Sequence, residues 1–168
     1  MAIIEKSTIK TEAYFSEDKK HRYLLRKEWD KNKKKAVVVM INPSTAQEIV
    51  TDHTTMFVIN NLSKLDYGSV DIVNMFSKVG TKLRLGVEMK ELVGDETDEF
   101  ISKSVEKADL VVIAWGKGAD NSKRITERQE QLKQLLEPFK EKLHQIGEIG
   151  YHPLCPQVRN SWILIKFK

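Results

Sequence analysis

Two short polar segments of this 168-residue chain hold the residue types that proton transfer and water activation require. Asn42-Pro43-Ser44-Thr45 follows an apolar run, and His152-Pro153 stands late in the chain. Histidine can carry or release a proton near neutral pH, whereas an asparagine amide only donates and accepts hydrogen bonds. The two segments are therefore candidates for one site, to which His152 would bring a titratable ring and Asn42 a hydrogen-bonding amide.

The apolar run Val37-Val38-Val39-Met40-Ile41 places the first segment at the end of a strand. It has no polar alternation, which is typical of a parallel strand covered on both faces. Pro43 cannot continue a central strand, and it favours an extended conformation for Asn42. Open α/β sheets bind their ligands at the carboxyl ends of such strands, so the turn is a candidate site.

Three more buried strands are expected at residues 70–76, at 110–115 and weakly at 145–149. Helical patterns separate them, at residues 54–66 with Thr54 as the cap, in part of 92–108, and at 121–144 with a kink or break at Pro138. Alternating strands and helices predict a single α/β domain over residues 1–168, with a mostly parallel sheet and helices on both faces. Residues 21–27 are expected to form a strand, at an edge of the sheet, and residues 162–167 a strand or an arm.

Parallel strands end at one edge, so the polar residues after them should meet there. The candidate set is Asn42, Pro43, Ser44, Thr45, Asp52, Thr54, Asn74, Phe76, Trp115, Lys117, His152 and Pro153. Structural roles remain open for the same residues: Asn42 can satisfy a turn, Ser44 and Thr45 can cap a helix, and Trp115 can belong to the core. No single one of these residues identifies a site by itself. The prediction depends on their expected convergence on one edge of the sheet.

Composition limits the partners and the cellular compartment that the chain can be expected to have. The net charge is +4, and nine Lys and Arg side chains fall within residues 19–35. Lys33, Lys34 and Lys35, together with Arg159, are candidates for phosphate contact, although a solvated hairpin rim explains the run equally simply. A lone cysteine, the lack of a long apolar run and the absence of metal-ligand spacing predict a cytoplasmic protein with no membrane, metal or cofactor requirement.

Six motifs occur in an order that resembles the domain-of-unknown-function family 1643 of bacteria and their phages. They are Arg22-Tyr23-Leu24-Leu25, residues 40–46 (MINPSTA), Asp52-x-Thr54, Val73-Asn74-Met75-Phe76, Ala114-Trp115-Gly116 and His152-Pro153-Leu154. Three positions depart from that family: His53 replaces its usual Pro, Thr97 a common Asn, and Cys155 the usual Tyr.

The layout also resembles, more distantly, the uracil-DNA glycosylase superfamily. Ile41-Asn42-Pro43-Ser44 is similar to its first motif, residues 112–119 to its Gly-Lys-x-Ala segment, and His152-Pro153-Leu154 to its late His-Pro-Ser motif, with Leu in place of Ser. This resemblance implies a three-layer α/β/α sandwich around a short, mostly parallel four-stranded sheet.

The same resemblance implies hydrolysis of an N-glycosidic bond in DNA or in a nucleoside. His152 would stabilise the leaving base, Asn42 would place the water, Asn74 would read the base, and Trp115 or Phe76 would stack on it. Two other classes remain open. One is a nucleotide- or nucleic-acid-binding module without catalysis, and the other is a module that binds a phage or host protein.

Overall fold

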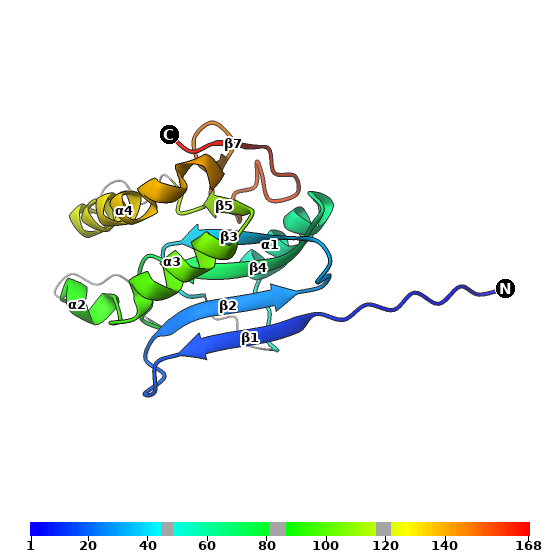
Figure 1. The fold of residues 1–168 in the computed structure, drawn as a ribbon, viewed down its shortest axis with the longest axis horizontal. Helices are drawn as coiled ribbons and strands as arrows, with labels where there is room; N and C mark the ends of the chain where they lie inside the picture. The colour runs from blue at the N-terminus through cyan, green and yellow to red at the C-terminus, as the bar shows by residue number, and fades with distance from the viewer. Residues whose placement is uncertain (45–48, 81–86, 117–121) are drawn as a thin grey trace.

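The computed structural model describes residues 1–44, 49–80, 87–116 and 122–168, and it is a mixed α/β fold built on one sheet. The strands are β1 (Lys10–Phe15), β2 (Arg22–Glu28), β3 (Lys34–Met40), β4 (Tyr67–Asn74), β5 (Leu110–Ile113), β6 (Leu143–Ile146) and β7 (Leu164–Lys166). They lie in the order β1-β2-β4-β3-β5-β6-β7. Before β1 the chain extends away from the sheet as an arm (Figure 1).

The centre of the sheet is parallel and its flanks are antiparallel. Strand β3 pairs in parallel with β4 and β5, and β5 pairs in parallel with β6. These are the four strands that the apolar runs predict. The predicted total of four strands is wrong, because β1, β2 and β7 extend the sheet to seven in antiparallel fashion. Strand β2 is also not at the edge, since β1 covers it.

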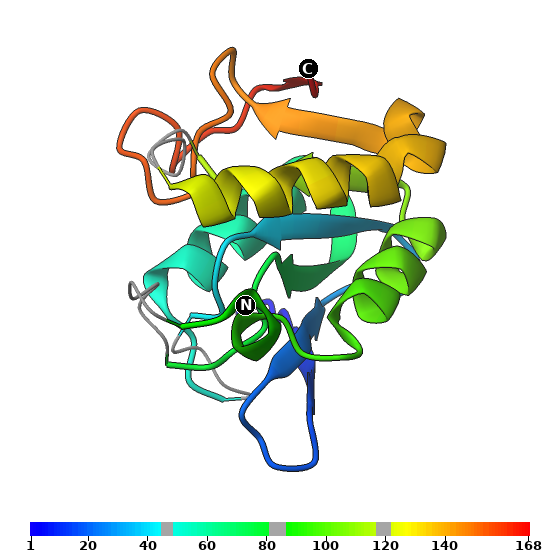
Figure 2. The same cartoon turned by 90° about the vertical axis from the view of Figure 1, so that its left-hand side faces the viewer.

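Helices pack on both faces of the sheet (Figures 1 and 2). Helix α1 (His53–Lys64) lies on one face, and α3 (Thr97–Lys107) and α4 (Lys123–Leu136) lie on the other, with the short α2 (Met89–Leu92) beside them. The arrangement follows from the connections. The crossover from β3 to β4 runs one way along the sheet, and those from β4 to β5 and from β5 to β6 run the other way, so right-handed crossovers pass over opposite faces. No helix among the described residues is long and apolar enough to cross a membrane.

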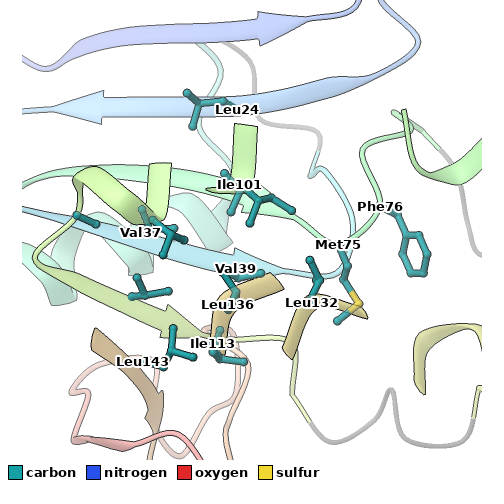
Figure 3. Close-up of a cluster of buried hydrophobic side chains, with 14 of the residues drawn as sticks. Leu24, Val37, Val39, Met75, Phe76, Ile101, Ile113, Leu132, Leu136 and Leu143 are labelled. Atoms are coloured by element: carbon teal, nitrogen blue, oxygen red, sulfur yellow. The ribbon is translucent and has the colours of Figure 1, made fainter. Parts of the chain in front are cut away.

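Strand β3 supplies both halves of the core because its side chains alternate. Val37 and Val39 pack under α3 and α4, whereas Val38 and Met40 pack under α1. Figure 3 shows the first cluster, in which Leu132 and Leu136 of α4 meet Val39 and Ile113 from the sheet. These strand residues are all but inaccessible to solvent, which explains why their sequence shows no polar alternation.

Two predicted helices have different ends in the structure. The helix expected over residues 121–144 ends at Leu136, and the break expected near Pro138 takes the form of a 3₁₀ segment, η2 (Glu137–Lys142). Strand β6 therefore starts at Leu143, two residues before the expected strand. Helix α1 starts one residue before Thr54 and is capped by Asp52, so the prediction of Thr54 as the cap is wrong.

Candidate functional site

The carboxyl ends of the four parallel strands lie side by side. Met40 of β3 pairs with Asn74 of β4, and Val39 pairs with Ile113 of β5. The pairing of β3 and β4 continues past the strand ends, because the N–H of Phe76 donates to the carbonyl of Ile41 at 3.0 Å. Residues just beyond these ends therefore meet at one edge, as the sequence predicts.

Asn74 lies on the α1 face of this edge, and Asn42 stands two residues beyond the end of β3. Ile41 packs against the core under α3 and α4, and Asn42 after it is half-buried. Asn74 follows Ile72 on the α1 face and is 2% exposed. Its Nδ2 has no hydrogen-bond partner among the described residues. A buried amide without a partner is unfavourable, so it marks a position kept for another reason.

A β-bulge brings Arg22 to the same face. Along the β1–β2 pair, Tyr14 lies opposite Leu24 and Phe15 lies opposite Arg22, so Tyr23 is an extra residue. The extra residue reverses the alternation that follows. Tyr23 stacks on Phe100 on the α3 side, whereas the guanidinium of Arg22 reaches the carbonyl of Ser44 at 3.5 Å. Arg22 is 2% exposed and thus places a buried positive charge beside the turn after β3.

Asp52 joins this turn to the start of α1. Its Oδ1 accepts a hydrogen bond of 2.8 Å from the N–H of Thr55, as an N-cap does. Burial alone would raise its pKa. The N–H of Thr55, the hydroxyl of Ser44 and the charge of Arg22 outweigh burial and hold the pKa of Asp52 below its ordinary value. Asp52 is therefore a carboxylate at neutral pH.

His152 completes the group from the loop after β6. Burial lowers the pKa of His152, and the negative charge of Asp52 opposes that change only in part, so the ring is neutral at pH 7. The N–H of Leu154 donates to Nδ1 at 3.1 Å, which leaves the ring proton on Nε2. The side chain is thus a neutral hydrogen-bond donor close enough to Asp52 to sense its charge.

Gly116 allows His152 to come this close. Its φ is +74°, and a Cβ at this position would lie 3.2 Å from the Cβ of His152. Arg22, Asn42, Ser44, Asp52, Asn74 and His152 together form what we call the strand-end site. Five of them belong to the predicted set. Arg22 does not, although it opens one of the motifs, because only the bulge at Tyr23 turns its side chain inward.

The remaining predicted residues lie elsewhere or play structural parts. Phe76 is fully buried in the core under α3 and α4, and Trp115 packs on that same side against Phe167. Thr54 and Pro153 are buried, and Pro43 is half-buried beside Asn42. Thr45 and Lys117 lie outside the described residues.

The predicted phosphate-binding cations divide between two places. Lys33, Lys34 and Lys35 surround the amino end of β3, so the length of that strand, roughly 25 Å, separates them from Asn42. Lys33 pairs with Asp66 at 2.7 Å, and Lys35 pairs with the buried Asp71 at 2.6 Å. Arg159 instead lies over the ring of Phe57 in α1. Within the described ranges, no three His, Cys, Asp or Glu side chains gather to hold a metal ion.

Comparison with known proteins places the chain in a family. The model described as "Protein of unknown function (DUF1643)" matches residues 22–154, and the chain belongs to that family. The matched region contains every member of the strand-end site. No curated protein and no solved structure matches the chain.

Proposed function

We propose that this DUF1643 protein hydrolyses an N-glycosidic bond at the strand-end site, on a fold of the uracil-DNA glycosylase type. The observation that carries the proposal is the neutral His152 ring with its proton on Nε2, beside the ionised Asp52. A glycosidic bond to a base breaks into a positive, oxocarbenium-like sugar and a negative leaving base. Such a reaction needs, in one site, a hydrogen-bond donor for the negative base and a negative group for the positive sugar.

The strand order supports the location. Starting from β3, the chain runs to β4 on one side and later to β5 and β6 on the other. Ligands of open α/β sheets bind where the strand order reverses in this way, outside the carboxyl ends. The reversal here falls between β3 and β5, with Asn42 after one strand and Gly116 after the other.

His152 would stabilise the departing base. A neutral imidazole can donate its Nε2–H to an oxygen or nitrogen on which negative charge develops, and a fixed donor strengthens as that charge grows. The bond from Leu154 to Nδ1 holds the tautomer that this role needs. Since burial keeps the ring neutral, His152 would act as a hydrogen-bond donor at pH 7, without first being protonated.

Asp52 would face the sugar. A carboxylate close to the anomeric carbon stabilises positive charge there, and Asp52 stays ionised because Thr55, Ser44 and Arg22 stabilise its charge. The amide of Asn42 would orient the attacking water through its carbonyl oxygen, which implies a slow enzyme because an amide cannot accept the proton. The free Nδ2 of Asn74 would donate to the edge of the base.

The charge distribution favours a nucleoside or a single nucleotide over duplex DNA as the substrate. Three of the four cations predicted to contact phosphates lie at the amino end of β3, away from the site. Arg159 alone of the four lies on the α1 side, with its guanidinium 5.8 Å from the centre of the Phe57 ring. One cation is enough for one phosphate, whereas a duplex needs several contacts to bind at physiological salt.

A binding module without catalysis is the second candidate. The hydrogen bond between Asp52 and Thr55 favours it, because a carboxylate that caps a helix already has a structural role. In that case the strand-end site would recognise a nucleotide and leave it intact.

Base release by the purified chain tests the proposal. The substrates are free nucleosides and nucleotides, together with single- and double-stranded DNA that contains uracil, hypoxanthine or alkylated bases. His152→Ala should abolish release, and His144→Ala should not, because His144 lies on β6 and contacts the carbonyl of Lys142. Stabilisation by a nucleotide without release would favour the binding module. If no substrate in the panel is cleaved and none stabilises the chain, both candidates are wrong.

A further inference from the structure

A cavity lies on the opposite face of the sheet from the strand-end site. Its volume is about 180 Å³, and it lies under α4 at the ends of β5 and β6. Its lining consists of Ile113, Trp115, Gly116, Gln129, Lys133, Gln145, Ile149, Gly150, Phe167 and Lys168. Neither Asn42, Asp52, Asn74 nor His152 is among them. We call it the Trp115–Gln129 cavity.

Gln129 is the unusual member of this lining. The side chain as a whole is 8% exposed, and its amide makes no hydrogen bond to any described residue. The amide atoms themselves are not among the fully buried polar atoms, so they reach the open space of the cavity. Because Gln129 lines an open cavity, a molecule in that cavity can supply the missing donor and acceptor.

Gln145 can offer the cavity only a hydrogen-bond acceptor. Its Nε2 donates to the carbonyl of Gly147 at 3.0 Å and to that of Glu148 at 2.9 Å. Both amide hydrogens are thereby used, and only the carbonyl oxygen of Gln145 is left to accept a hydrogen bond. The cavity thus offers one fixed acceptor, from Gln145, and one amide, from Gln129, that can donate and accept.

Aromatic walls and volume restrict the shape of an occupant. Trp115 meets Phe167 edge to face, with ring centres 5.7 Å apart. An apolar cavity engineered into another protein, at roughly 150 Å³, holds one benzene ring, so a space of this size suits a single six-membered ring. The two cations of the lining are already paired, Lys133 with Glu130 and Lys168 with Glu148. The rim therefore has no unbalanced charge that would favour an anion.

We propose that the Trp115–Gln129 cavity binds a neutral, planar six-membered lactam, a ring with N–H beside C=O as in pyridone or a pyrimidine base. The ring N–H would donate to Gln145 or Gln129, the ring carbonyl would accept from Gln129, and one face of the ring would pack against the aromatic side chains of Trp115 and Phe167. This site is separate from the strand-end site and does not depend on the function proposed for it.

An NMR titration tests the assignment. The probes are 2-pyridone and uracil, with pyrimidine as a ring of the same size without the lactam and benzene as a purely apolar ring. Lactams at millimolar concentration should shift the side-chain amide of Gln129 and the indole N–H of Trp115. Pyrimidine and benzene should bind at least tenfold more weakly. Equal binding of all four rings, or no shift with either lactam, would show that the cavity is only a void or a water site.

Three variants separate recognition from folding. Gln129→Leu keeps the volume and should weaken lactam binding at least tenfold, and Gln129→Glu should do the same by removing the amide donor. Gln134→Leu is the control, since Gln134 lies on the exposed side of the same helix. Melting temperature and spectral dispersion report whether each variant folds. If either folded Gln129 variant binds lactams as tightly as the parent chain, the proposal is wrong.

Discussion

Gly116 and His152 approach each other so closely that a methyl group on the glycine would lie 3.2 Å from the Cβ of the histidine. The contact joins the loop after β5 to the loop after β6, which are separated by α4 in the sequence. It depends on a backbone conformation, φ +74°, that residues with a side chain rarely adopt. The position of His152 thus depends on a residue that has no chemistry of its own.

Replacing Gly116 by alanine should destabilise the chain and displace His152. The left-handed backbone costs an alanine about 1–2 kcal/mol, and the contact with His152 adds to that cost. Gly80→Ala is the matched control, because Gly80 has φ +71° and a Cβ added there would meet nothing within 4 Å. Urea unfolding measures both free energies. Equal losses in the two variants would mean that His152 moves aside without cost.

Two buried asparagines should respond in opposite ways to substitution by leucine. Asn74 and Asn61 are each 2% exposed, but Asn61 donates to the carbonyls of Phe57 and Arg159 and accepts from the N–H of Trp162. Asn61→Leu should lower the free energy of unfolding by more than about 2 kcal/mol, because these groups lose their partner. Asn74→Leu should raise it by about 1 kcal/mol, because an unpaired donor is removed.

Thermal unfolding with and without a bound nucleoside measures both effects. Asn74→Leu should also lose the stabilisation that the nucleoside gives. A clear loss of stability in the apo Asn74→Leu protein would show that Asn74 serves packing and not recognition.

The stability of the chain should fall as pH decreases from 7 to 5. Burial lowers the pKa of both His21 and His152 in the folded state. As pH falls through about 6.5, the unfolded chain therefore binds protons that the folded chain does not, and unfolding becomes easier. The loss is complete once pH is below the folded pKa values. For His21, protonation also removes the acceptor that faces the hydroxyl of Ser77 at 2.8 Å.

Urea midpoints across this pH range check the sign of the effect. The double variant His21→Gln/His152→Gln should lose less stability between pH 7 and 5 than the parent chain. His53→Gln, at an exposed position, should follow the parent. A parent chain that gains stability on acidification would contradict the assignment of both rings as buried and neutral.

Ser44→Ala should raise the pKa of Asp52. The hydroxyl of Ser44 is one of the groups that stabilise the charged form of Asp52, so its removal makes protonation easier. A carboxyl-detected NMR titration gives the pKa directly. Ser63→Ala, on the exposed face near the end of the same helix, is the control and should leave that pKa unchanged.

Local patterns predict the centre of the fold and much of the site, because both depend on neighbouring residues. The runs around Val38 and Val112 predict parallel strands, and the turn at Asn42-Pro43 marks the edge at which the candidate site lies. Strand β1 is different: its burial alternates only weakly, so its sequence carries no strong strand signal. It forms because β2 offers it an edge, which is information that lies elsewhere in the chain.

The parts of the site that sequence does not predict depend on geometry between distant segments. The inward turn of Arg22 needs a bulge at Tyr23, which the residue types around it do not specify. Strand β4 ends at Asn74, so alternation no longer tells which face of the sheet Phe76 occupies. In the structure Phe76 lies in the core under α3 and α4, on the same side as Met75. The tautomer of His152 depends on a single backbone bond from Leu154.

The central claim is tested most directly by the rate of base release by His152→Gln. The rate is measured in single turnover, beside the parent chain, on whichever substrate of the panel is cleaved. Glutamine keeps a donor but loses the fixed imidazole, so the rate should fall at least about 100-fold, as removal of a positioned donor does in other enzymes. Asp52→Asn should show a comparable loss, because the positive sugar would lose its counter-charge. Release by His152→Gln within about twofold of the parent rate would contradict the account, since the neutral ring of His152 would then play no part in the reaction.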